Sequence, residues 1–246
     1  MPAHTVEPPA TLPASRMLGE ALRFAPHVQR LTQPAPAAPA DRPKPAASNR
    51  GEQYQIHALR TAKPPDIDGV LSDEAWRTAP VIDSFTQQEP VNGQPATERT
   101  EVRILYDASN LYIAVHAFDS DPDHLVATEM RRDANNLYNN DHFGVSFDGF
   151  YDRRNGYGFA VNALGAELDW SITNERPNND WNGQWDVKTG TFEHGWTVEI
   201  RFPFRSFRFK EHSHVWGMNF RRRVMVWKRE FAPQRQRPYD SDTAWD

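Results

Sequence analysis

Short β-branched and aromatic stretches, separated by turn-forming residues, run through the chain from Tyr54 onward and constrain its fold more than any other feature. Such a pattern is typical of an all-β domain. Two antiparallel sheets packed face to face can cover many short strands at once. We therefore predict an antiparallel β-sandwich of about nine or more strands. The expected strands are 53–59, 100–106, 111–118, 142–147, 157–162, 167–173, 184–191, 196–202 and 215–227.

The side-chain pattern within these segments indicates how some of them are covered. Both faces of the 111–118 segment are largely apolar, which predicts a central strand buried on both sides. In the 142–147 segment Phe143, Val145 and Phe147 alternate with small or polar residues, which predicts one covered face. The segment Ser72–Trp76 starts with an N-cap residue followed by acidic side chains, so we expect a short helical turn that carries Trp76 into the core.

The first fifty residues have a different composition. Ten of the 20 prolines lie there, whereas all eight tryptophans lie at or after Trp76. Segment 34–50 is rich in Pro and Ala and has almost no large side chain to bury, so we predict a disordered linker. Ahead of it we expect a short amphipathic helix over Met17–Leu31, broken near Pro26. The predicted organisation is a tail and linker over 1–50, one folded domain over 51–230, and a tail over 231–246 that begins a following region.

Composition excludes several classes of protein. No run of about 18 apolar residues is present, so we expect no transmembrane helix in this chain. The formal charge is −5 and the two signs are interspersed, which argues against a nucleic-acid partner. The absence of cysteine excludes thiolate catalysis, disulfides and cysteine-based zinc sites.

The segment Asp169–Asp186 combines three tryptophans with many planar polar side chains, and its middle, 174–183, is expected to be a surface loop. Sugar recognition needs flat aromatic faces beside groups that hydrogen-bond hydroxyls in two directions. Trp181, Trp185 and Trp170 are therefore candidate sugar-binding residues, with packing inside the protein as the alternative for each. For Trp76, Trp196 and Trp216, which lie in apolar segments, we predict core positions.

A second polar cluster, Arg131–Asp141, precedes a predicted strand. The guanidinium of Arg132 could bridge vicinal hydroxyls or a uronate, and Asp141, Asn162 and Asp169 lie at strand ends that would share a sheet face with it. The alternative is that these side chains only pair with one another to organise a loop. We predict a carbohydrate-binding face from the four residues together with the three tryptophans.

We predict no metal site and no cofactor from the residues. Asp119, Asp121 and Asp123 alternate as oxygen donors but lack the glycine and distal glutamate of a helix-loop-helix calcium loop. His212 and His214 lack an evident third ligand. A glycosidase would need two carboxylates, one on either side of the scissile glycosidic bond, and Glu167 with Asp169 could supply them. Many other acidic pairs in this sequence could supply them as well, and no catalytic motif accompanies this pair. We expect no catalysis.

Several motifs taken in order resemble the family-9 carbohydrate-binding modules, and most closely the branch that precedes a C-terminal β-barrel domain in bacterial envelope proteins. The resemblance covers about residues 64–227. Its residues are Ile67–Trp76, Ala96–Val102, Leu105–Asp107, Leu111–Tyr112, Arg131–Asp133, Asp141, Asp148, Asp152–Arg154, Phe159, Asn162, Gly165, Asp169, Gly195–Trp196, Glu199, Pro203–Phe204 and Trp216–Gly217.

The resemblance implies a jelly-roll-like sandwich that binds a polysaccharide or oligosaccharide, often beside a hydrolase of O-glycosyl bonds and sometimes with structural calcium. It also implies export to the periplasm, outer membrane or extracellular space, although no signal peptide is visible, and an attached C-terminal domain in a longer protein. Two alternatives stay open. One is an envelope protein-interaction or structural sandwich without sugar affinity, in which the basic residues of 201–223 contact a partner or an acidic glycan or are only solvated. The other is a glycoside hydrolase.

Overall fold

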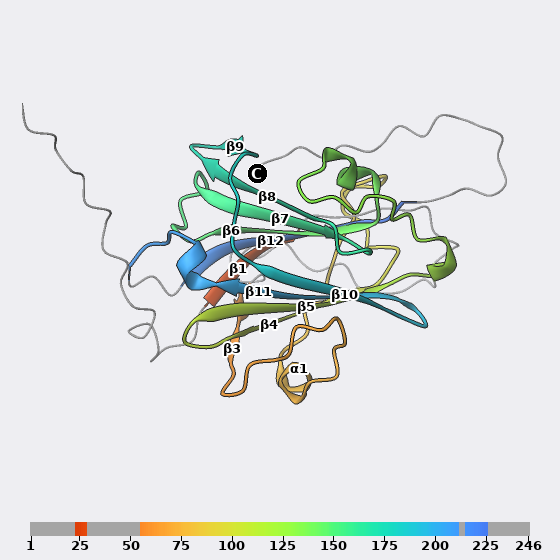
Figure 1. Ribbon diagram of the computed structural model, residues 1–246, viewed down its shortest axis with the longest axis horizontal. Helices are drawn as coiled ribbons and strands as arrows, with labels where there is room; N and C mark the ends of the chain where they lie inside the picture. The colour runs from red at the N-terminus through yellow and green to blue at the C-terminus, as the bar shows by residue number, and fades with distance from the viewer. Residues whose placement is uncertain (1–22, 29–54, 212–214, 226–246) are drawn as a thin grey trace, which may run out of the picture.

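The structure, a computed structural model, describes residues 23–28, 55–211 and 215–225 and consists of two stacked β-sheets (Figure 1). The larger sheet has seven strands in the order β2 (Ile56–His57), β1 (Arg23–Val28), β12 (Val215–Arg223), β6 (His142–Asp148), β7 (Gly156–Asn162), β8 (Glu167–Thr173) and β9 (Arg176–Asn178). The smaller sheet has five, in the order β10 (Asp186–Phe192), β11 (Gly195–Pro203), β5 (Asn110–Phe118), β4 (Thr100–Tyr106) and β3 (Leu59–Arg60).

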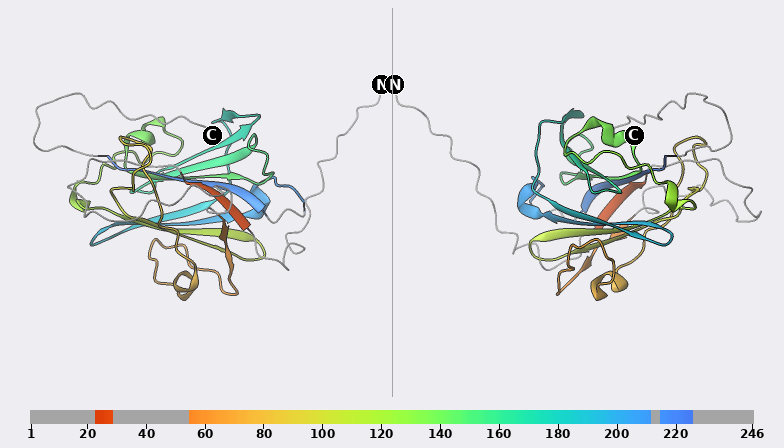
Figure 2. Two further views of the ribbon diagram at one scale, coloured as in Figure 1. Left: turned by 180° about the vertical axis from the view of Figure 1, so that it is seen from behind. Right: turned by 45° about the vertical axis from the view of Figure 1, so that its right-hand side comes forward.

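Neighbouring strands are antiparallel except for two pairs, β1 with β12 and β3 with β4. The view from behind and the view turned by 45° show the sheets as separate layers, with α1 (Glu74–Thr78) on the outer side of the smaller sheet (Figure 2). Three short 3-10 turns complete the described elements: η2 (Pro122–His124), η3 (Asn135–Asn139) and η4 (Phe204–Ser206). The predicted all-β sandwich is therefore confirmed. No described helix is long and apolar enough to cross a membrane.

The main core lies between the sheets and is dominated by aromatic rings. Phe147, Phe159 and Phe202 meet at its centre, with ring centroids 4.6 to 5.7 Å apart. Trp196 and Trp216 are buried in the same cluster, as predicted. Strand β5 is buried on both faces, as its apolar pattern predicts. The prediction of one covered face for β6 is wrong, because the residues on its other face, such as His142, are buried as well.

Two local predictions are wrong, and a third is confirmed except for its capping residue. A strand, β1, occupies 23–28 within the segment predicted as a helix; the rest of that helix and the linker 34–50 lie outside the described residues. Strand β9 lies inside the predicted loop 174–183, where its three exposed residues pair with the end of β8. Helix α1 confirms the predicted helical turn that carries Trp76, but it begins two residues after Ser72, and its N-cap position, Asp73, makes no side-chain capping bond.

Candidate functional site

An open cleft with a volume of about 710 Å³ lies where the segment leading into β10 faces the end of β11. The loop 107–109 between β4 and β5, together with the first residue of β5, closes one side of the cleft, and the turn η4 contributes to another. Trp185 supplies aromatic surface, and the other side chains are mostly polar. The cleft is lined by Ser109, Asn110, Gly183, Gln184, Trp185, Asp186, Arg201, Pro203 and Arg205.

Trp185 is held in one orientation by contacts on its edge and its face. Its indole N–H donates to Asp169 Oδ2 at 2.9 Å. Its ring stacks on Phe202 of the core with an interplanar angle of 16°. Only 8% of the residue is exposed, so most of the ring anchors the cleft wall and a small part faces the cleft. A fixed aromatic surface of this kind suits a rigid ring-shaped ligand, because no side-chain rotamers need to be ordered on binding.

Asp169 and Arg132 connect this wall to the larger sheet. Asp169 is completely buried, accepts the Gly183 amide at 3.0 Å, and also binds the guanidinium of Arg132. Arg132 in turn donates to Glu167 and to Asn182 Oδ1, the latter at 2.9 Å. The predicted residues Arg132, Asp169 and Trp185 are therefore joined in one network. The network positions the segment before β10, but Asp169 itself lies behind the cleft wall.

Burial and charge compete at the two carboxylates of this network. Desolvation raises the pKa of Asp169 above its ordinary value, and the hydrogen bonds from Trp185 and Gly183 and the charge of Arg132 oppose that rise. Desolvation likewise raises the pKa of Glu167, with Arg132 again acting in the opposite direction. Arg132 therefore compensates two partly desolvated carboxylates at once, which explains its position between them.

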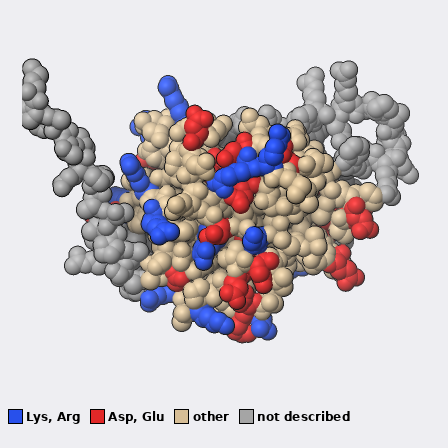
Figure 3. Space-filling model, in the orientation of Figure 1, with Lys and Arg blue, Asp and Glu red and all other residues tan. Residues whose placement is uncertain are grey.

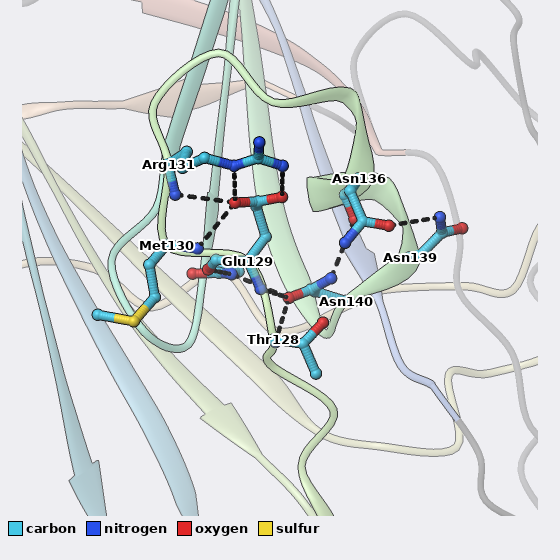
Figure 4. A network of polar contacts seen from close by, with 8 residues as sticks. Thr128, Glu129, Met130, Arg131, Asn136, Asn139 and Asn140 are labelled. Carbon is cyan, nitrogen blue, oxygen red and sulfur yellow. Dashed lines mark hydrogen bonds and ion pairs between the residues drawn. The ribbon is translucent and has the colours of Figure 1, made fainter.

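The loop that carries Arg132 is itself fixed by a second polar network (Figure 4). Asn140 Oδ1 accepts the backbone amides of Thr128 and Glu129 at 2.6 and 3.0 Å. The Glu129 carboxylate accepts two bonds from the Arg131 side chain at 2.9 Å, and these bonds lower its pKa to about 2. The loop is thus rigid immediately before Arg132.

Asp141 and Asn162, which we predicted to contact sugar, lie inside the molecule. Asn162 is fully buried; its amide group donates to Glu129 O at 2.7 Å, and its oxygen accepts two amides of the turn after β7. Asp141 is 1% exposed and accepts the amides of Val126 and Met225. Because their polar atoms are used within the fold, we leave both residues out of the proposed site.

The remaining two predicted tryptophans lie on different sides of the larger sheet. Trp181 is half-buried and packs against Tyr157 and Phe159, with ring centroids 4.9 and 5.9 Å away, on the side facing the core. Trp170 is half-buried on the opposite, outer face, where its ring covers Gly158 so closely that a Cβ there would come within 2.1 Å of it. The three tryptophans therefore do not form one surface.

Comparison with known proteins decides the family. Residues 67–227, more than half of the chain, match the family model described as "Carbohydrate family 9 binding domain-like". The chain belongs to this family. No curated protein matches it. Among solved structures, a family-9 carbohydrate-binding module from Caldicellulosiruptor kristjanssonii in complex with cellotriose has 16% identity and a TM-score of 0.48, over 66% of this chain and 73% of that chain. The same family's module from that organism in complex with glucose has 18% identity and a TM-score of 0.45, over 66% and 76%.

The first of the motifs that resemble the family, Ile67–Trp76, packs against a buried acid of the smaller sheet. Glu199 of β11 is fully buried and accepts the amides of Asp68 and Gly69 at 2.9 and 2.7 Å, together with the Trp76 indole N–H at 2.7 Å. Trp76 is 2% exposed and packs with Leu105 and Tyr112 on the outer side of the smaller sheet. The predicted burial of Trp76 is confirmed, in this second cluster and not between the sheets.

Sequence reasoning missed several residues of the cleft. Arg201 was noted only as part of a basic segment, yet it lines the cleft and pairs with Asp186 at 2.9 Å. Arg222 of that same segment is 2% exposed and donates to Arg99 O and Thr100 Oγ1, so it is not a surface cation. The only signal available was the density of basic residues, which does not tell which strand face each one occupies.

The described residues contain no group of three or more His, Asp or Glu side chains arranged to hold a metal ion. Asp121, from the acidic segment after β5, instead pairs with His124 at 2.5 Å. His212 and His214 lie outside the described residues. Structural calcium stays a prediction from the family resemblance.

Proposed function

We propose that this domain binds a saccharide, without chemical turnover, in the cleft beside Trp185. The observation that supports this proposal is the cleft itself. Its fixed indole is surrounded by Gln184, Asn110 and Arg201, whose planar polar groups suit sugar hydroxyls. Its volume of about 710 Å³ lies within the usual range for small-ligand sites. Family membership supports the same ligand class.

Weak affinity is expected, because little of the Trp185 ring faces the cleft. A dissociation constant between about 1 mM and about 1 μM corresponds to roughly −4 to −8 kcal/mol. A few hydrogen bonds and partial stacking on Trp185 can supply this binding free energy after the loss of translational and rotational entropy on association. Attachment to a neighbouring module would raise retention on a polymer through local concentration.

A hydrolytic role for Glu167 and Asp169 finds no support in the geometry. Both carboxylates bind the same guanidinium, and Asp169 also accepts the Trp185 indole N–H and the Gly183 amide. A general acid needs a transferable proton directed at the substrate. Asp169 is fully buried and directs its oxygens at protein donors.

The test is a binding screen of the full chain by calorimetry against soluble glucans, xylans and their oligosaccharides. For a ligand that binds, Gln184→Ala is expected to weaken binding about threefold to tenfold, the effect of losing one or two hydrogen bonds. Because Gln184 is exposed, its removal should leave the melting temperature unchanged.

Gln94→Ala is the matched control, since Gln94 is also exposed but lies in a different loop and does not line the cleft. Equal affinities of wild type and both variants would move the site elsewhere. Failure of every saccharide to bind would refute the proposed function.

A further inference from the structure

The cleft lining holds more positive than negative side chains, and the excess is one arginine. Arg201 is compensated, because its Nε and Nη2 both lie 2.9 Å from Asp186 Oδ2. Arg205, at the centre of η4, is exposed and lines the same cleft, and no acidic side chain among the described residues forms an ion pair with it. Two arginines and one aspartate give the cleft lining a formal charge of +1.

The turn η4 fixes the base of Arg205. Phe204 and Phe207 on either side are buried in the core, the Phe204 amide donates to Ser109 O at 2.8 Å, and Ser206 Oγ donates to Gln184 O at 2.7 Å. The last two bonds join η4 to two other walls of the cleft. The guanidinium of Arg205 therefore extends from a backbone that is held in place beside Gln184 and Trp185.

On these grounds we propose that the cleft selects saccharides that carry a carboxylate, namely uronic-acid units, with Arg205 as the residue that recognises the acid group. This inference rests on the proposed function and narrows it. A guanidinium presents two parallel N–H donors that match the two oxygens of a planar carboxylate, whereas a hydroxyl can use only one of them. The sugar ring of the same unit would lie against the exposed part of Trp185.

The surroundings are compatible with an anionic ligand but are not uniformly basic. On the face of the molecule drawn in Figure 3, Lys and Arg side chains are intermixed with Asp and Glu. A mixed surface gives weak general attraction for polyanions. Selectivity for an acidic sugar must therefore come from the local contact with Arg205, and it should depend on one residue.

The experiment compares a trigalacturonate with its fully methyl-esterified form, which keeps the ring and hydroxyls but loses the charge, and with cellotriose. Calorimetric titration of the full chain should show the acid binding about five to ten times more tightly than the ester at low salt, with the ratio falling as salt is added. Arg205→Gln should reduce the ratio to about one, because binding of the acid falls by more than binding of the ester.

Arg77→Gln is the control, because Arg77 is also exposed but lies on α1, on the outer side of the smaller sheet, and should leave the ratio unchanged. Equal binding of acid and ester by the wild type would overturn the acid selectivity while leaving saccharide binding intact. Preference for a sulfated neutral glycan over the uronate would overturn it as well, and loss of all binding would refute the proposed function itself.

Discussion

Single side chains explain why the family motif begins with Ile67–Trp76. Gly69 has φ +87°, and a Cβ on it would lie 2.7 Å from Thr189 O. Its amide and that of Asp68 are the donors that satisfy the buried Glu199 carboxylate. Desolvation raises the pKa of Glu199, and these donors together with Trp76 oppose the rise. The motif is thus the structural partner of one buried acid.

Replacement of Gly69 by alanine should be strongly destabilising. The left-handed backbone disfavours a Cβ, and the clash is with backbone oxygen that cannot move without shifting β10. We expect a loss of about 2 kcal/mol or more in the free energy of unfolding, measured by denaturant titration.

Gly165→Ala is the comparison, because Gly165 has a similar φ of +83° but its nearest atom is the Thr189 hydroxyl at 3.3 Å, which can rotate away. Equal losses for the two variants would show that the close approach at Gly69 contributes nothing.

Residue type and context predicted some of these positions and not others. Trp196 and Trp216 stand in apolar strands, so burial of the largest side chains placed them correctly. Asp141 and Asn162 are also buried, and each pairs with a backbone group of a loop distant in sequence: Asp141 accepts the Val126 amide, and the Asn162 side chain donates to Glu129 O. A polar residue at a strand end looks the same in sequence whether its partner is water, a ligand or a distant amide.

The buried Asp141 should make stability depend on pH. Desolvation raises its pKa to about 6, with Asp119 adding to the rise and Arg222 and two backbone amides opposing it. The folded state therefore keeps this proton to higher pH than the unfolded state does. The stabilisation from this group is complete below the ordinary pKa of 3.8 and is lost as the pH rises through about 6.

Between about pH 4 and pH 7, the unfolding free energy of the wild type should fall relative to that of Asp141→Asn by roughly 2 kcal/mol. Urea titrations of both proteins across this range measure the difference. Stability curves that stay parallel would contradict the raised pKa.

At the level of elements, the cleft depends on a contact between two loops and a strand. Arg132, at the end of one rigid loop, binds β8 through Glu167 and Asp169 and the segment before β10 through Asn182. This single side chain connects segments that are 50 residues apart in sequence. Positioning of Trp185 therefore depends on Arg132 although Arg132 does not line the cleft.

Arg132→Gln should loosen the segment before β10 without unfolding the sandwich. Hydrogen exchange at the Gly183 amide, which donates to Asp169, is expected to accelerate at least about tenfold, because opening of this segment loses the charged contacts that oppose it. Arg77→Gln is the control, since Arg77 pairs with Glu74 on α1 and lies on the outer side of the smaller sheet. An unchanged exchange rate at Gly183 in Arg132→Gln would show that Arg132 does not hold the segment before β10 in place.

Strand predictions succeeded where the pattern was long and bounded by turn residues. β4 and β8 have the predicted bounds, and β5, β6, β7, β10 and β11 differ by one or two residues at their ends. β9 is too short and polar to produce a periodic signal. β1 contains Pro26 and pairs with β12 over nearly two hundred intervening residues, and local sequence cannot indicate such a partner.

In the whole molecule, the larger sheet separates Trp170 from the cleft. The cleft beside Trp185 lies where the start of β10 meets the end of β11 in the smaller sheet, whereas Trp170 lies on the outer face of the larger sheet, where it packs against the cluster that contains Leu137. The cleft combines a fixed ring, polar walls and an arginine, Arg205, with which no acidic side chain of the described residues forms an ion pair. Export of the protein and an attached C-terminal domain stay predictions from the resemblance.

Saccharide binding in the cleft is tested most directly by NMR titration of the ¹⁵N-labelled chain with the tightest-binding oligosaccharide from the screen. The indole N–H of Trp185 and the side-chain amide of Gln184 should shift progressively and saturate, while the Trp170 indole signal stays in place. Saturating shifts confined to Trp170 and its neighbours on the outer face, with Trp185 unmoved, would contradict the account.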